Sequence, residues 1–228
     1  MIRLKDILKE DEVEDNFGKV FLGNNRDIAK LQGKEPEKNT PSEKKILIAL
    51  TRWVAKLSDS GWDSAQKTLM NNYPLLKKAA STFPTVLKPK TPNGTELYRG
   101  LNTLNPSLKS QLFKTSPSDW IEAGTLWRYT KPISYTPHQD IQSWSTNKLI
   151  ARGFSTELDF KGGILITNQN DEFLFNQDLI SIINSKTGAN EVDESEVLYF
   201  GKQYSNDVYI MVHDPVFKEI KDYYFKNR

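Results

Sequence analysis

The sequence predicts an α+β protein in which helices come first and short strands follow. Apolar residues recur at helical spacing before residue 83, and a group of prolines then ends the helical character. Beyond residue 95, short runs of β-branched, apolar and aromatic residues are separated by Gly, Pro, Asn and Ser. Helices followed by strands, without regular alternation of the two, are typical of an N-terminal helical lobe and a β-rich core.

Residues 1–41 differ from the rest and are expected to form an N-terminal appendage. Residues 1–10 carry a weak amphipathic pattern that fits a short docking helix. Residues 9–41 are charged and interrupted by Gly, Asn and Pro, with a short helix expected only around residues 20–31. The remaining residues, 42–228, are expected to form one domain.

Two helices are expected in the lobe at residues 42–82. Ser42 can cap the first, which contains apolar residues at helical spacing: Ile46, Leu47, Leu50, Trp53, Val54 and Leu57. The second covers residues 63–80 and should break or kink near Pro74, because proline lacks the backbone N–H that a helix needs. Residues 83–94, which contain three prolines, should connect the lobe to the core.

The β-rich core is expected at residues 95–212. It begins with a strand at 96–101 and a helix at 105–113, with Pro106 in the first turn of that helix. A further helix is expected at 148–154. The other expected elements are strands: 125–130, 141–145, 163–167, 172–175, 196–200 and 208–212.

Composition excludes several classes of function. The chain has 228 residues, 37% of them hydrophobic, which is enough for a substantial core. A net charge of +2 does not favour a general nucleic-acid binder, and the absence of cysteine removes disulfides and thiol catalysis. His138 and His213 are too isolated to indicate a metal site, so none is expected. Without an apolar run of membrane length or a signal-peptide pattern, we expect a cytoplasmic protein with no membrane partner.

Two glutamates stand at the start of the strand expected at 196–200. In an extended chain, residues two apart point to the same side, so Glu194 and Glu196 would face one way. Two interpretations are open. In the first, the two glutamates are solvated acids of a loop. In the second, a cationic substrate or a cation-like transition state offsets their mutual repulsion.

Two further strand ends carry polar residues that also have two interpretations. Arg99, on an otherwise apolar strand, is either a surface residue or a ligand for phosphate, which its guanidinium geometry suits. Gly100 after it would let a ligand approach the backbone closely. The hydroxyls of Ser143, Ser145 and Thr146 can orient carboxylates or a ribose. Alternatively, Thr146 or Asn147 simply caps the helix that follows.

The order of these motifs resembles the arginine–serine–glutamate group of mono-ADP-ribosyltransferases. In that family, a strand with an arginine, a strand with Ser-Thr-Ser and a strand with Glu-x-Glu follow one another along the chain in that order. Here Leu97-Tyr98-Arg99-Gly100, Ser145-Thr146-Asn147 and Glu194-Ser195-Glu196 follow in the same order over residues 95–212. Phe154, nine residues after Ser145, is similar in spacing to an aromatic that several toxins of the family place near nicotinamide. An arginine that some members carry three residues later is Glu157 here, which is a departure.

The resemblance implies a two-sheet, mostly antiparallel core of the ADP-ribosyltransferase type, with NAD as substrate. Glu196 would stabilise the oxocarbenium ion that forms when the nicotinamide–ribose bond breaks, and Ser145 would position it. Glu194 would orient or deprotonate the acceptor. In the family, a Glu at this position accompanies modification of arginine, so the resemblance implies a protein arginine as acceptor. A nucleic-acid acceptor stays an open alternative that no motif indicates.

The remaining implied roles concern NAD binding. Arg99 would hold phosphate, Gly100 would face the nicotinamide amide, and Thr146 and Phe154 would complete the NAD site. The compact size and short appendage are similar to bacteriophage and bacterial-toxin members, which implies action in a host cytosol and, for some, packaging in a virion. The alternatives are an NAD glycohydrolase toxin and a catalytically silent binding module with this fold.

Three tryptophans and one histidine lie near these motifs in the sequence. Trp120, Trp127 and Trp144 line a pocket or belong to the core, which is the commoner place for aromatics in strands. The segment Tyr135-Thr136-Pro137-His138 is a candidate loop over the cleft, and its His138 is not needed as a base by the proposed chemistry.

Overall fold

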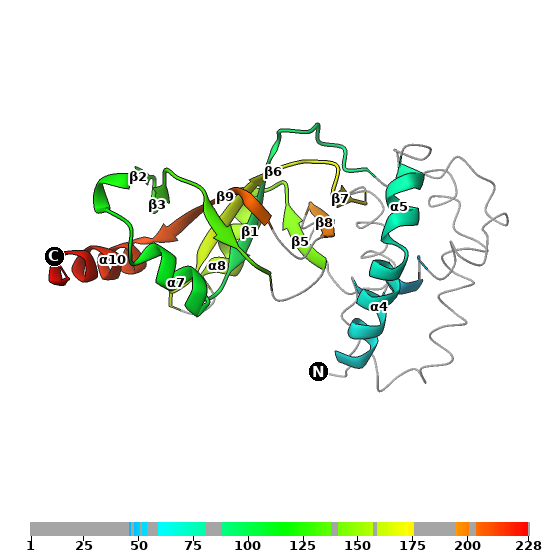
Figure 1. The fold of residues 1–228 in the computed structure, drawn as a ribbon, viewed down its shortest axis with the longest axis horizontal. Coiled ribbons are helices and arrows are strands. Elements are labelled where there is room, and N and C mark those ends of the chain that lie inside the picture. Colours follow the sequence, from blue (N-terminus) through cyan, green and yellow to red (C-terminus); the bar gives the residue numbers. More distant parts are fainter. Residues whose placement is uncertain are drawn as a thin grey trace. The chain divides into compact units, whose positions relative to one another are not determined.

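A computed structural model describes most of the chain beyond residue 87 and part of what precedes it. The described residues are 46, 48–50, 52–53, 59–80, 88–137, 141–156, 159–175, 195–200 and 204–227. The chain forms two compact units, one of residues 1–90 and 172–193, the other of residues 91–171 and 194–228 (Figure 1). The expected elements within 1–45, and both Glu194 and His138, lie outside the described residues.

The first unit contains the helices expected from the apolar pattern. Described residues between 46 and 53 are helical, and Ile46, Leu50 and Trp53 are buried as predicted. The second expected helix is two helices, α4 (Asp59–Asn71) and α5 (Tyr73–Ala80). The predicted break near Pro74 is therefore confirmed, because Pro74 lies in the first turn of α5, where its missing N–H costs no helical hydrogen bond. The short strand β7 (Phe173–Leu174) also belongs to this unit.

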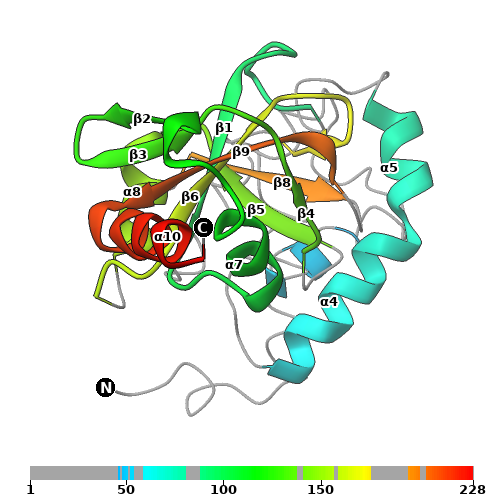
Figure 2. The ribbon, with the colours of Figure 1, turned by 60° about the vertical axis from the view of Figure 1, so that its left-hand side comes forward.

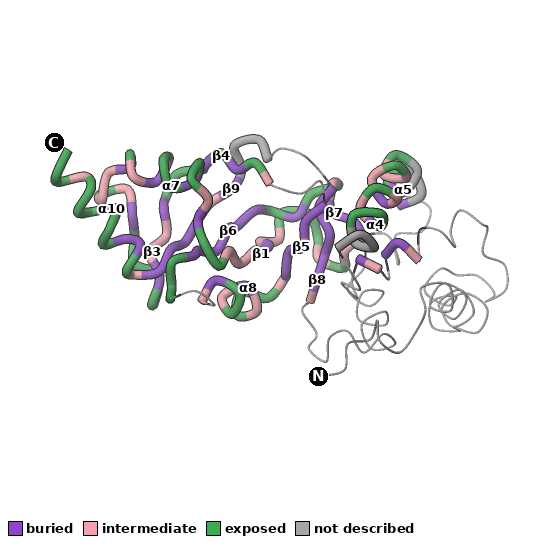
Figure 3. The backbone as a smooth tube through the Cα atoms, turned by 90° about the horizontal axis from the view of Figure 1, so that it is seen from below, coloured by how far each residue is buried: buried purple, intermediate pink, exposed green. Residues whose placement is uncertain are grey.

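The second unit is built on a mostly antiparallel sheet, which confirms the α+β prediction at this level. Its strand order is β2-β3-β9-β6-β1-β5-β8, and β4 pairs separately with β9. The strands are β1 (Glu96–Leu101), β2 (Trp120–Ala123), β3 (Leu126–Tyr129), β4 (Ile133–Tyr135), β5 (Ile141–Ser145), β6 (Gly163–Asn168), β8 (Glu196–Phe200) and β9 (Tyr204–His213). β8 is buried throughout and β5 and β6 are mostly buried, as the tube in Figure 3 shows, whereas β1 is mostly of intermediate burial.

Helices of this unit begin at residues suited to the position. Asn105 caps α7 (Pro106–Leu112) by accepting a hydrogen bond from the Leu108 N–H at 2.8 Å, and Pro106 stands at its start as predicted. Asn147 caps α8 (Lys148–Ser155) in the same way. A short 3₁₀ helix, η3 (Pro117–Asp119), precedes β2.

Four elements were not predicted: η3, β2, β4 and the C-terminal helix α10 (Asp214–Lys226). β2 and β4 have only four and three residues, too few to show an alternating pattern. For α10 the signals are present, because Asp214 and Pro215 begin the helix and its buried residues recur at helical spacing: Val216, Phe217 and Ile220.

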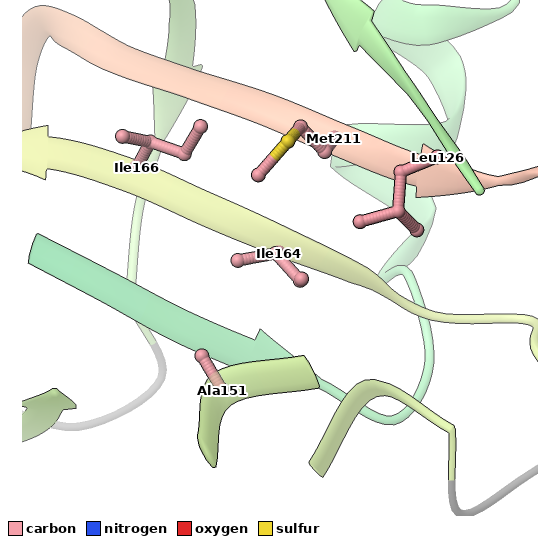
Figure 4. Close-up of a cluster of buried hydrophobic side chains, with 5 residues drawn as sticks. All are labelled: Leu126, Ala151, Ile164, Ile166 and Met211. Atoms are coloured by element: carbon pink, nitrogen blue, oxygen red, sulfur yellow. The ribbon is translucent and has the colours of Figure 1, made fainter. Parts of the chain in front are cut away.

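The two faces of the sheet are covered by different helices. On one face, Ala151 of α8 packs with Ile164 and Met211 in a cluster completed by Leu126 and Ile166 (Figure 4). On the opposite face, Phe217 of α10 stacks on Trp127 with ring centroids 3.9 Å apart. Leu126 and Trp127 are consecutive in β3, so their side chains point to opposite sides. We call these the α8 face and the α10 face.

Candidate functional site

The three strands that carry the sequence motifs lie next to one another in the sheet. β1, β5 and β8 are consecutive in the strand order, and Figure 2 shows β5 and β8 side by side. Ser145 pairs directly with Glu196 on one side and with Tyr98 on the other. Because directly paired residues point to the same side of a sheet, these three residues form a row on the α8 face.

The Ser145–Glu196 pair is buried. The relative exposures of Ser145 and Glu196 are 6% and 8%. Ionised carboxylates are almost never this buried unless a partner offsets the cost of removing them from water. Glu196 is therefore a buried acid at the start of a strand, and the interpretation that it is a solvated loop acid is wrong.

The end of β5 ties this pair to the start of helix α8. The Ser145 Oγ accepts a hydrogen bond from the Asn147 N–H at 3.0 Å. The Asn147 side chain accepts one from the Leu149 N–H at 2.9 Å, so the helix-capping interpretation of Asn147 is confirmed. The same short segment thus positions Ser145 and begins the helix.

Thr146 contacts the backbone just before Glu196. Its N–H and its hydroxyl both point to the Ser195 carbonyl oxygen, at 3.1 and 3.4 Å. Ser195 has φ of 47°, a left-handed conformation that costs free energy in a residue other than glycine. Thr146 therefore holds a strained bend, and its hydroxyl is directed to protein backbone.

The bend at Ser195 corrects one premise of the sequence argument. β8 begins at Glu196, and the chain is not extended through Ser195. The period-two rule that would place the preceding glutamate on the same side as Glu196 does not apply across a left-handed residue. Glu194 itself lies outside the described residues.

Arg99 lies on β1, one residue from the row and on the other face. It is paired with Leu165 of β6, while its neighbour Tyr98 belongs to the α8 face. The Arg99 Nη1 donates a hydrogen bond to the Ser143 carbonyl oxygen at 2.6 Å. Its Nε is buried without a hydrogen-bond partner, and within the described part of the chain no carboxylate forms an ion pair with it.

Gly100 is required by the packing of α8. A Cβ atom at this position would overlap the Ala151 carbonyl oxygen and lie 2.7 Å from the Phe154 Cβ. The side of Gly100 that lacks a side chain is therefore filled by α8, so the prediction that this space receives a ligand is corrected. The same contact brings Phe154, which is 39% exposed, next to β1 on the face that carries Ser145 and Glu196.

A polar cluster on the same face was missed by the sequence argument. The Tyr98 hydroxyl donates to Glu96 Oε2 at 2.8 Å, and Arg128 Nη2 lies 3.4 Å from Glu96 Oε1. The Arg128 guanidinium is also 5.7 Å from the centre of the Tyr209 ring. Burial and the bond to Glu96 raise the pKa of Tyr98 to about 12, so its phenol stays protonated. Glu96 and Tyr98 are two apart in β1, and that spacing was the available signal.

The tryptophans and the wider chain add further results. Trp144 and Trp120 are 1% and 5% exposed and belong to the core, as expected.

Among the described residues, no group of three or more acidic or histidine side chains could hold a metal ion. No helix in the described part of the chain is both long and apolar enough to cross a membrane.

Comparison with known proteins gave no relative. No protein-family model, no curated protein and no solved structure matches this chain.

Proposed function

We propose that the protein is an NAD-dependent mono-ADP-ribosyltransferase of the arginine–serine–glutamate group, with that family's two-sheet core. The observation that carries this proposal is the direct pairing of Ser145 on β5 with Glu196 on β8, where β5 is also next to β1, the strand that carries Arg99. Three motifs that are 46 and 51 residues apart in sequence thus occupy three consecutive strands. This arrangement is the support for the proposal.

The chemistry follows from the placement of Glu196. When the bond between the ribose C1′ and the nicotinamide nitrogen breaks, nicotinamide leaves with the bonding electron pair and C1′ becomes an oxocarbenium ion. A buried carboxylate stabilises that positive charge more strongly than it stabilises the neutral ribose, because little water screens it. Ser145, directly across the strand pair, limits the orientations open to that carboxylate.

The acceptor then completes the reaction. An acceptor nitrogen or oxygen forms the new bond to C1′ and gives up one proton. A guanidinium must lose its proton before it can attack, so transfer to arginine needs a base, the role proposed for Glu194. Water attacking in its place gives ADP-ribose, which is the glycohydrolase alternative.

Arg99 and Phe154 supply the proposed binding contacts. Arg99 lies on the opposite face of the sheet from Glu196 and its Nε is buried, so the phosphate contact assigned to it rests on the resemblance alone. Phe154 exposes part of its ring beside Gly100 and is suited to contact nicotinamide. Thr146 is occupied with the Ser195 carbonyl, so we assign it the support of Glu196 in place of an NAD contact.

Two labels on NAD test this proposal. The purified protein is incubated with a cell lysate and with NAD labelled either in the adenylate or in the nicotinamide part. Transfer predicts adenylate label on protein and free labelled nicotinamide. Free nicotinamide with free ADP-ribose alone would support the glycohydrolase, and intact NAD in every sample would overturn both enzymatic proposals.

A further inference from the structure

The second unit contains a buried serine–histidine pair that the proposed chemistry does not use. Ser155 Oγ and His213 Nε2 are 2.9 Å apart, and the two residues are 0% and 3% exposed. The pair joins the last residue of α8 to the last residue of β9. Substrate cannot reach a serine this buried, so a nucleophilic role is excluded.

The hydrogen bonds determine which nitrogen of His213 carries the proton. The Ser155 hydroxyl donates its single hydrogen to the Arg152 carbonyl oxygen at 2.8 Å. His213 Nε2 must then donate to the Ser155 oxygen for both contacts to be satisfied. Ser155 is therefore held from two sides, by the preceding turn of its own helix and by the sheet.

This pair lies next to the residues that form the proposed NAD site. Ser155 directly follows Phe154, whose Cβ would be 2.7 Å from a Cβ on Gly100. His213 lies on the α8 face because it is paired with Leu126, a member of the cluster under α8. The Phe160 ring contacts the His213 ring edge to face, with centroids 5.2 Å apart.

We propose that Ser155 and His213 are positioning residues for NAD: their hydrogen bond fixes the last turn of α8 and so holds Phe154 beside Gly100. This inference rests on the proposed function. Without the tether, the last turn of α8 would lose its only described side-chain hydrogen bond to β9, and Phe154 would sample other positions. The binding of NAD should weaken, while Ser145 and Glu196, on β5 and β8, keep their geometry.

The test compares two losses of a buried hydrogen bond. Ser155→Ala removes the tether. Thr115→Ala removes the bond from the Trp120 Nε1 to the Thr115 hydroxyl, at 2.8 Å, which does not involve α8. Both substitutions should lower the melting temperature, but only Ser155→Ala should raise the KM for NAD, by about fivefold, with kcat within about twofold.

Two further measurements separate positioning from general destabilisation. His213→Gln retains an N–H donor near the position of Nε2 and should restore much of the affinity that His213→Leu loses. Amide hydrogen exchange should accelerate in 148–156 of Ser155→Ala and stay unchanged in β6.

An unchanged KM in Ser155→Ala, or an equal rise in Thr115→Ala, would overturn the positioning role while leaving the proposed function standing. Failure of the wild-type protein to bind or cleave NAD would instead overturn the proposed function, and the positioning role with it.

Discussion

At the scale of single residues, Arg99 of β1 has a buried side-chain nitrogen without a hydrogen-bond partner. It makes one hydrogen bond, to the Ser143 carbonyl, and its buried Nε makes none. A lysine would keep the charge but has no planar fork of donors for two phosphate oxygens. Arg99→Lys should therefore weaken NAD binding about tenfold, as measured by calorimetry.

Arg128→Lys is the matched control for that substitution. Arg128 also lies on a strand of the sheet, but it is ion-paired with Glu96 and partly exposed. Its substitution should leave the affinity for NAD unchanged. If both variants bind NAD like the wild type, Arg99 is a structural residue and not a phosphate ligand.

His213 makes stability depend on pH. Its burial, and next the nearby charge of Arg152, lower its pKa below the ordinary value of 6.5. The contact with Ser155 acts in the opposite direction but does not prevail. Between the folded and unfolded pKa values, the unfolded chain binds more protons, so the contribution of His213 to stability is complete above pH 6.5 and declines below it.

Urea unfolding at several pH values checks this prediction. The free energy of unfolding should fall between pH 7.5 and 5.5 more steeply in the wild type than in His213→Gln, which shares every other titrating group. Parallel pH profiles for the two proteins would show that His213 titrates alike in the folded and unfolded states.

At the scale of elements, the contact between α8 and β1 depends on a single missing side chain. Gly100→Ala would press a Cβ into the Ala151 carbonyl and should lower the free energy of unfolding by about 2 kcal/mol or more. Gly153, within α8, has nothing within 4 Å of its Cβ position. Gly153→Ala should instead raise the free energy of unfolding by about 0.5–1 kcal/mol, because alanine favours helices.

Chemical denaturation of the two alanine variants decides this point. The free energy of unfolding should fall in Gly100→Ala and rise in Gly153→Ala. A Gly100→Ala variant as stable as the wild type would mean that α8 can shift away from β1 without cost, and the close approach of Phe154 to Gly100 would then need no glycine.

Much of the fold was accessible from sequence at this scale, and the failures have physical reasons. A short apolar and aromatic run, a proline at a helix start and a candidate helix cap predicted β1, α7 and α8 within two residues of their ends. Strands of three or four residues, such as β2 and β4, contain too few alternations to be distinguished from loops. The sequence showed that Ser145 and Glu196 belong to strand ends, but not that they pair directly.

Sequence could not reveal contacts that depend on tertiary packing. Ser155 and His213 are 58 residues apart, and nothing in their neighbours indicates that a helix end and a strand end meet there. The prediction that the space at Gly100 receives a ligand was also wrong, because a missing Cβ makes room for a ligand or for a helix equally well. Only the position of Ala151 distinguishes the two.

At the scale of the whole molecule, the residues of the proposed site that the structure describes lie within the second compact unit. Residues 1–40 contribute none of them, and their sequence lacks a strong apolar pattern. Deletion of residues 1–40 should leave a chain that unfolds cooperatively on heating and still cleaves NAD. Loss of the thermal transition in the truncated chain would show that this segment is part of the core.

The most direct test of the central claim is the rate of nicotinamide release by Glu196→Gln. The substitution keeps the size of the side chain but removes the charge that an oxocarbenium ion requires. Such a loss is expected to cost about 3–5 kcal/mol in the transition state, so the rate should fall by at least a few hundred-fold. Glu122→Gln, at an exposed position of β2, should release nicotinamide at the wild-type rate. A folded Glu196→Gln protein that cleaves NAD as fast as the wild type would contradict the account.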